Sequence, residues 1–215
     1  MKELQPIAFD LALVRAELDR LKGLLNSKTD LSERDDIQPL FKSCPQLSAF
    51  IGMLIPGVSP ADRIAFEFDV FGDFTADLII GNSGRKAYCA VEFEDARPNS
   101  ILHKTGRFQK EWGRRFEHGF GQLIDWFFAF DDLKGSSAFA QHFGSPAAEF
   151  SGLLLIGRSA HLDDYDKRRV RWRSDRVSVN THTVLCRTFD ELAGDLERQS
   201  ALFSYARPEP EKPTA

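Results

Sequence analysis

Hydrophobic positions near the N-terminus recur with the spacing of an amphipathic helix. Over residues 7–25 the apolar side chains alternate spacings of four and three, and charged residues occupy the other faces; the stripe consists of Ile7, Leu11, Val14, Leu18, Leu21 and Leu25. This heptad-like pattern predicts a helix. Two interpretations stay open: the helix packs on its own domain, or residues 1–29 form an appendage through which the chain self-associates.

The next part of the chain changes from a helical to a strand period. Residues 32–52 are predicted to form two short helices, because Pro39 and Pro45 interrupt the pattern and Ser32 with Asp35 resembles a cap. Within residues 64–94 the period becomes that of strands: Phe66, Phe68 and Val70 alternate with polar residues, and residues 75–80 and 86–94 follow as a second and a third strand. Gly81 to Gly84 supply a turn. We therefore expect an antiparallel meander of three strands.

Aromatic residues dominate the predicted long helix over residues 105–131. They form a continuous stripe with one leucine: Phe108, Trp112, Phe116, Phe120, Leu123, Phe127 and Phe130. Gly113, Gly119 and Gly121 weaken this helix, and each would let a neighbouring backbone approach closely. Residues 134–144 are interpreted as a loop.

The C-terminal part alternates buried strands with helices. Strands are predicted at residues 151–158 and 183–188, because both runs are almost wholly apolar, and a basic helix at 162–173. Thr188 with Glu191 forms a capping box that begins a last helix ending near residue 198. The fold class is therefore α/β, with a mixed central sheet flanked by helices over residues 30–200 and a disordered tail at 201–215.

Composition narrows the class of protein. The longest apolar run is far shorter than a membrane span, and the first residues do not resemble a secretion signal, so no membrane association is expected. Three distant cysteines argue against a disulfide framework and fit the cytoplasm. The net charge of -4 means that any contact with DNA must come from local basic patches.

Three acids are the main candidate for chemistry. Glu92 and Glu94 share one face of a strand, and Asp77 joins that face if the hairpin pairs residues whose numbers sum to an odd value, as 77 does with 92. Clustered carboxylates supply the hard oxygen ligands that Mg²⁺ (or Mn²⁺) prefers, and such an ion promotes phosphodiester hydrolysis. The competing interpretation is a solvated face of a strand.

Polar and basic residues around these acids suggest further contacts. Gln122 and Trp126, with His118 one turn earlier, form a polar ledge beside the aromatic stripe. In one interpretation Gln122 reaches a phosphate or orients water. In the other, the ledge only packs against a neighbouring strand. Glu33 and Gln38 precede the meander and are weaker candidates. Two basic groups would neutralise a phosphate backbone, or merely form solvated helix faces: Lys104, Arg107, Lys110, Arg114 and Arg115, then Lys167, Arg168, Arg169, Arg171, Arg173 and Arg176.

Six short motifs in order resemble the Shedu anti-phage domain at the C-terminus of SduA. They span about residues 30–198: Glu33-x4-Gln38 with Cys44-Pro45-x-Leu47, Phe74 to Ile80, Ala90-Val91-Glu92-Phe93-Glu94, Gln122-Leu123-x2-Trp126, Leu155-Ile156-Gly157-Arg158, and Thr188 to Leu192. The resemblance implies a PD-(D/E)XK restriction-endonuclease-like fold, a nuclease active in prokaryotic defence, metal binding by Asp77 and Glu92, DNA as substrate, and a homo-oligomer (dimer or higher).

One position departs from the family pattern. Glu94 stands where the family has a lysine that positions the attacking water, and a glutamate supplies no positive charge. Glu94 can instead bind metal or accept a proton from water. We therefore expect either a metal-dependent DNA endonuclease or nickase with Asp77, Glu92, Glu94 and Gln122 as catalytic residues, or a degenerate nuclease fold that binds nucleic acid or assembles. Lys104 is the nearest later cation that would offset the added charge.

Overall fold

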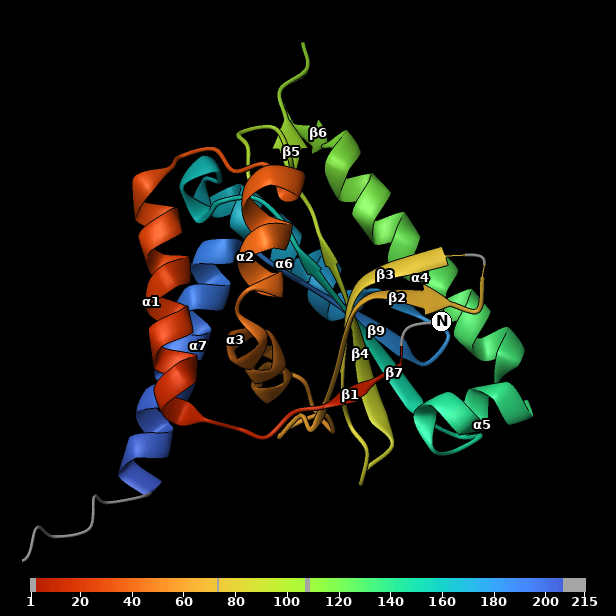
Figure 1. Cartoon of the computed structure of the whole chain (residues 1–215). Coiled ribbons are helices and arrows are strands. Elements are labelled where there is room, and N and C mark those ends of the chain that lie inside the picture. Colours follow the sequence, from red (N-terminus) through yellow and green to blue (C-terminus); the bar gives the residue numbers. More distant parts are fainter. Residues whose placement is uncertain (1–2, 73, 107–108, 207–215) are drawn as a thin grey trace, which may run out of the picture.

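The computed structural model describes residues 3–72, 74–106 and 109–206, which fold around one mixed sheet. Its seven strands lie in the order β1-β2-β3-β4-β7-β9-β8, with helices on both faces (Figure 1). The predicted α/β class with a mixed sheet flanked by helices is therefore confirmed. The strands are β1 (Gln5–Pro6), β2 (Arg63–Val70), β3 (Phe74–Asn82), β4 (Ala87–Phe93), β7 (Glu149–Leu155), β8 (Ser178–Val179) and β9 (His182–Arg187).

The N-terminal stripe is buried within this chain. Helix α1 (Leu11–Ser27) begins at Asp10, whose side chain accepts the backbone N–H groups of Ala12 and Leu13. It lies beside α3 (Pro45–Phe50) and α7 (Phe189–Ala206) on one face of the sheet (Figure 1). Its buried side chains are Val14, Leu18, Leu21 and Leu25. The stripe thus forms part of the domain core, and self-association through it stays a prediction.

The interrupted helical region is confirmed. Ser32 caps a short π-helix, η1 (Glu33–Ile37), which leads directly into α2 (Gln38–Lys42). Pro39 lies in the first turn of α2 and Pro45 begins α3, so each proline stands where its missing N–H costs no hydrogen bond. A 3₁₀ turn, η2 (Ile51–Leu54), then leads to the sheet.

The antiparallel meander β2-β3-β4 is also confirmed, and its register decides where the acids lie. Leu78 faces Val91, and continuing this register by one residue places Asp77 opposite Glu92. The odd sum required for a shared acidic cluster is therefore met. On its other side β4 pairs in parallel with β7, so β4 lies in the middle of the sheet and is buried along its length.

Two predictions in the middle of the chain are wrong. The long helix begins at residue 114 rather than 105: α4 spans Arg114–Leu133, and a small hairpin of β5 (Leu102–His103) and β6 (Glu111–Trp112) precedes it. Gly113 allows this break, because a Cβ there would lie 2.4 Å from the carbonyl oxygen of Ser100. The predicted loop contains α5 (Ser137–Phe143), whose two buried phenylalanines attach it to the core.

The C-terminal elements follow the predicted order with a longer last helix. Helix α6 (Asp164–Arg176) follows a 3₁₀ turn, η3 (Ser159–His161). The Thr188–Glu191 capping box is confirmed, since each backbone N–H meets the other residue's side-chain oxygen, at 2.9 and 3.2 Å. Helix α7 continues to Ala206, so its predicted end near residue 198 is wrong. Residues 207–215 of the predicted tail lie outside the described residues.

Two apolar cores form, one on each face of the sheet. The first includes α1, α3 and α7, and the second includes the aromatic stripe of α4 with α5 and α6. Helix α4 therefore lies across the face to which Glu92 and Glu94 point. Within the described part of the chain, none of the helices has the length and apolar character that crossing a bilayer requires.

Candidate metal centre

Glu92 and Glu94 lie where β4 ends, beneath α4. The side chains of their neighbours Val91 and Phe93 enter the opposite core, so the alternation of the strand directs both acids toward α4. Gly119 allows the close approach, because a Cβ there would lie 2.9 Å from Cγ of Glu94 and 3.4 Å from Cγ of Glu92. Glu92 is 4% exposed and Glu94 is fully buried. The predicted pair therefore shares one face, inside the protein rather than on a solvated surface.

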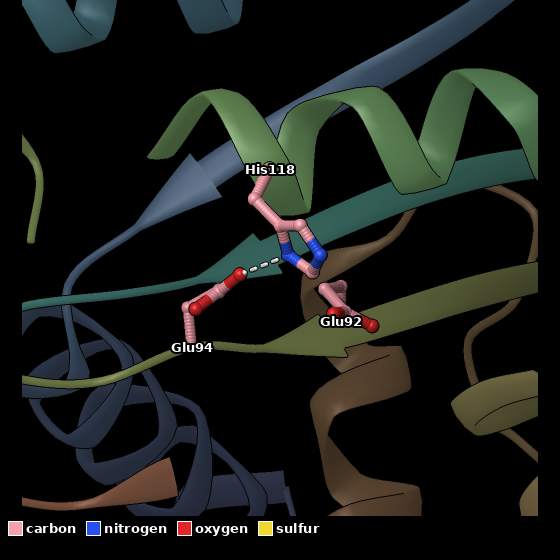
Figure 2. Close-up of side chains that lie close together, drawn as sticks. All are labelled: Glu92, Glu94 and His118. Atoms are coloured by element: carbon pink, nitrogen blue, oxygen red, sulfur yellow. Dashed lines mark hydrogen bonds and ion pairs between the residues drawn. The ribbon is translucent and has the colours of Figure 1, made fainter. Parts of the chain in front are cut away.

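His118 completes a compact set with these two acids. Its Nδ1 lies 2.8 Å from Oε1 of Glu94. Glu92, Glu94 and His118 each offer one ligand atom, and these atoms lie within 4.8 Å of one another (Figure 2). From the sequence, His118 was only part of a polar ledge; the signal that could have found it is its position directly before Gly119, the residue that brings α4 onto β4.

Asp77 is held at the edge of this set by two donors. The backbone N–H of Phe93 donates to one carboxylate oxygen at 2.9 Å, and Nε2 of Gln38 donates to the other at 3.0 Å. The same Nε2 also donates to Oε1 of Glu33 at 3.1 Å. Glu33 and Gln38, which the sequence supported only weakly, therefore belong to the acidic cluster, and η1 contributes the fourth carboxylate.

Arg115 supplies the positive charge beside the cluster. One of its terminal nitrogens lies 3.2 Å from Glu33 and 3.2 Å from Glu94, and its Nε lies 3.5 Å from Asp95. The expectation that Lys104 offsets the charge is therefore wrong, because Arg115 takes that place from the first turn of α4. Lys104 is exposed on the segment after β5.

The four carboxyl groups resist ionisation in the absence of a cation. Burial, reinforced by the charges of Asp77, Glu94 and Glu33, raises the pKa of Glu92 to about 11. Burial is also the main cause that raises the pKa values of Glu33, Asp77 and Glu94. Among the described residues, Oε2 of Glu92 is buried without a hydrogen-bond partner. A divalent cation would satisfy that oxygen and favour the charged form of its neighbours, so the donor set fits a metal ion.

Gln122 lies one turn after His118 on α4. Its Oε1 is buried and has no hydrogen-bond partner in the part of the chain that the structure describes. No described hydrogen bond joins Gln122 to the acids, so its predicted catalytic role rests on its place on the helix. The indole Nε1 of Trp126, one turn further, is also buried without a described partner.

The predicted nucleic-acid-binding residues fall into different environments. Arg107 lies outside the described residues, whereas Arg114, Arg168 and Arg171 are exposed and Lys167 is half-buried. Arg169 has a structural role: it donates to the carbonyl oxygen of Lys110 at 2.8 Å and stacks over Trp112. Arg173 likewise forms a two-pronged ion pair with Glu117. The exposed arginines of α6 thus remain the best candidates for phosphate contacts.

Comparison with known proteins assigns the chain to one family. The family model described as Shedu protein SduA, C-terminal, matches residues 30–193, which is most of the chain. No curated protein matches the chain.

Proposed function

This chain belongs to the Shedu SduA C-terminal family, a membership that points to anti-phage defence, and from that premise we propose that it is a metal-dependent DNA endonuclease or nickase. The observation that supports this most is the oxygen of Glu92, buried and unpartnered among four carboxyl groups. Such an arrangement destabilises the folded chain unless a cation binds. Asp77 and Glu92 are the proposed ligands of Mg²⁺ or Mn²⁺.

The fold proposed for this activity is of the PD-(D/E)XK type. Its supporting features are the three-stranded antiparallel meander, the parallel pairing of β4 with β7 and of β7 with β9, and acids on the second and third strands of the meander. Asp77 and Glu92 would hold a metal ion there, which would supply a water of lowered pKa and offset charge on the phosphoryl oxygens. The protein's own contribution is to hold Asp77 in position through Gln38 and the Phe93 amide, beside Glu92 on the neighbouring strand.

The glutamate in place of lysine is compatible with this chemistry. Arg115 lies 3.2 Å from Glu94, so a positive charge is present although residue 94 does not supply it. Arg115 is half-exposed and can therefore face a phosphate oxygen as well as the acids. Glu94 contacts His118 and Arg115, whereas Oε2 of Glu92 has no hydrogen-bond partner among the described residues; Asp77 and Glu92 are the direct ligands of this proposal.

The alternative is a nuclease fold that binds DNA without cutting it. The specific observation in its favour is that both carboxylate oxygens of Glu94 already have protein partners, so residue 94 offers little to an attacking water. This alternative predicts salt-sensitive DNA binding with no cleavage under any metal. Assembly into a dimer or larger oligomer stays a prediction for either function, to be measured by sizing the purified protein.

Cleavage of plasmid DNA tests the proposal. The full chain should nick or cut supercoiled DNA with Mg²⁺ or Mn²⁺, and Asp77→Asn and Glu92→Gln should each lower the rate by about 100-fold or more. Asp125→Asn, which changes an exposed acid on α4, is the control and should retain the wild-type rate. If wild-type protein is inert on supercoiled, linear and single-stranded DNA with both ions, the nuclease proposal is wrong.

A further inference from the structure

His118 lies over the acids from the start of α4, with the two ring nitrogens in different environments (Figure 2). Nδ1 contacts Oε1 of Glu94 at 2.8 Å, while the other ring nitrogen, Nε2, points toward Glu92. The side chain is 60% exposed, so an ion arriving from solvent can reach it. His118 therefore lies between the solvent and the buried carboxylates.

The contact with Glu94 determines which nitrogen is available. In the tautomer that carries its proton on Nδ1, His118 donates to Oε1 of Glu94, whose other oxygen accepts from Arg115. That tautomer leaves the lone pair of Nε2 available to an ion, and Nε2 lies on the side of the ring next to Glu92 (Figure 2). A histidine whose second nitrogen donates to a carboxylate is the usual arrangement of a metal-binding imidazole, since that bond fixes the tautomer and orients the ring.

We propose that Nε2 of His118 is a nitrogen ligand of the ion held by Glu92, and that Glu94 positions His118 rather than acting as the principal ligand. This inference rests on the metal-binding part of the proposed function and adds to it the chemical class of the ion. A site with an imidazole nitrogen favours Mn²⁺ and Co²⁺ over Mg²⁺, which prefers oxygen ligands and water.

This assignment explains why position 94 carries a glutamate. A lysine there could not accept the Nδ1 proton of His118, and its charge would repel the ion. Glu94 is fully buried and meets His118 on one oxygen and Arg115 on the other, which is the environment of an orienting carboxylate. Where the family has a lysine ammonium group, this chain has Glu94, which orients the imidazole of His118 as a nitrogen ligand.

Mn²⁺ bound to the full chain is the probe. Pulsed electron paramagnetic resonance should detect coupling of the Mn²⁺ electron spin to an imidazole nitrogen, and calorimetry should give the affinity. In His118→Ala the coupling should vanish and return when free imidazole is added. Mn²⁺ affinity should fall on the order of 10- to 100-fold, and Mg²⁺ affinity by no more than about threefold. His118→Gln serves as a second variant, and His142→Gln on α5 as the matched control.

The outcomes separate this inference from the proposed function. Coupling that depends on His118 supports the nitrogen ligand, whatever the nuclease assay shows. If Mn²⁺ binds and Glu92→Gln abolishes binding, yet wild-type protein shows no imidazole coupling, the role of His118 is refuted and the metal centre survives. Coupling that persists in both His118 variants also refutes it. Failure of wild-type protein to bind Mn²⁺ at millimolar concentration refutes the inference together with the metal-dependent nuclease.

Discussion

Gly119 and Glu94 are in such close contact that no larger residue fits at position 119. A Cβ on Gly119 would lie 2.9 Å from Cγ of Glu94, and 2.6 Å from a methyl carbon of Leu154 on β7. The glycine therefore sets how closely α4 approaches β4, and with it the distance between His118 and the acids. A helix-weakening residue is retained here because the site requires that approach.

Gly119→Ala should push α4 away from β4 and loosen the metal centre. Overpacking of this kind costs about 1–3 kcal/mol of unfolding free energy, and we expect Mn²⁺ affinity to fall by roughly tenfold, which is about 1.4 kcal/mol. Gly121→Ala is the matched control, because a Cβ at position 121 meets no described atom within 4 Å. It should stabilise the helix by about 0.5–1 kcal/mol. Thermal unfolding and calorimetry measure both effects, and equal behaviour of the two variants would contradict the close-contact interpretation.

Glu92→Gln should make the metal-free protein more stable at alkaline pH. The folded pKa of Glu92, about 11, exceeds its ordinary value of 4.5, so the folded chain retains a proton that the unfolded chain releases. Stability from this group is therefore complete below pH 4.5 and is lost as the pH rises toward 11. At pH 8 the variant should gain up to about 5 kcal/mol, because each of the roughly 3.5 pH units above 4.5 costs the wild type about 1.4 kcal/mol.

Mn²⁺ should make the wild-type protein more stable than the Glu92→Gln variant. Mn²⁺ should raise the Tm of the wild-type protein, because it binds the folded state, and should leave Glu92→Gln nearly unchanged. Unfolding curves between pH 5.5 and pH 9, with and without Mn²⁺, provide the measurement. A variant less stable than the wild type at every pH would show that Glu92 has a stabilising partner in the metal-free protein.

Arg115→Gln should have opposite effects on folding and on metal binding. Arg115 lies within 3.5 Å of Glu33, Glu94 and Asp95, but it is half-exposed, so its loss should cost only about 0.5–1 kcal/mol of unfolding free energy. Mn²⁺ affinity should rise roughly fivefold, as expected from removing about 1 kcal/mol of charge repulsion. Arg114→Gln, which changes the exposed neighbour, should alter neither quantity. Reduced Mn²⁺ affinity in Arg115→Gln would indicate that the arginine organises the site.

The exposed arginines of α6 should contribute to DNA binding, whereas Arg169 should contribute to folding. Arg168→Ala with Arg171→Ala should weaken binding and reduce the slope of log affinity against log salt by about 2, close to one unit for each phosphate that the protein no longer neutralises. Arg169→Ala should lower Tm, because Arg169 bonds the Lys110 carbonyl and stacks over Trp112. Fluorescence anisotropy over a salt series tests this. An unchanged slope in the double variant would exclude this face of α6 from the DNA interface.

Leu18→Ala should destabilise the domain itself. Leu18 is 4% exposed in the core formed by α1, α3 and α7, so truncation should cost about 2–5 kcal/mol. Leu13, on the same helix, is 50% exposed, and Leu13→Ala should change stability by less than about 0.5 kcal/mol. Chemical unfolding measures both. A Leu18→Ala protein of normal stability but altered size in solution would favour the self-association interpretation of α1.

Local pattern was sufficient for the strands that bear the acids. Alternation in β2 and the Gly81–Gly84 turn predicted the meander, and two-residue periodicity placed Glu92 and Glu94 on one face. The sequence does not fix the register between β3 and β4. Paired residue numbers could sum to an odd or an even value, and only the observed pairing shows that the sum is odd. Local sequence therefore predicted that Asp77, Glu92 and Glu94 meet, provided that the β3–β4 register pairs Asp77 with Glu92.

The partners of those acids depend on helix placement, which the sequence did not predict. His118 and Arg115 reach Glu94 because α4 begins at residue 114 and crosses β4 at Gly119. The aromatic stripe continues through Trp112 into the preceding β6, where Trp112 stacks on Phe116 at 4.5 Å, so its period did not reveal the break. Helix α5 was missed because Gly135, Ser136 and Gly144 mark its ends as strongly as they would mark a loop.

Arg115 joins parts of the chain that are made far apart in time. It links Glu33, which precedes the whole meander, to Glu94 at the end of β4, and β4 is enclosed only once β7 pairs beside it. A nascent chain therefore has no complete metal centre until about two thirds of it has left the ribosome. A fragment that begins after Glu33 or ends before β7 lacks one of these segments, so it would lack the complete centre and, with it, the proposed DNA-cutting activity.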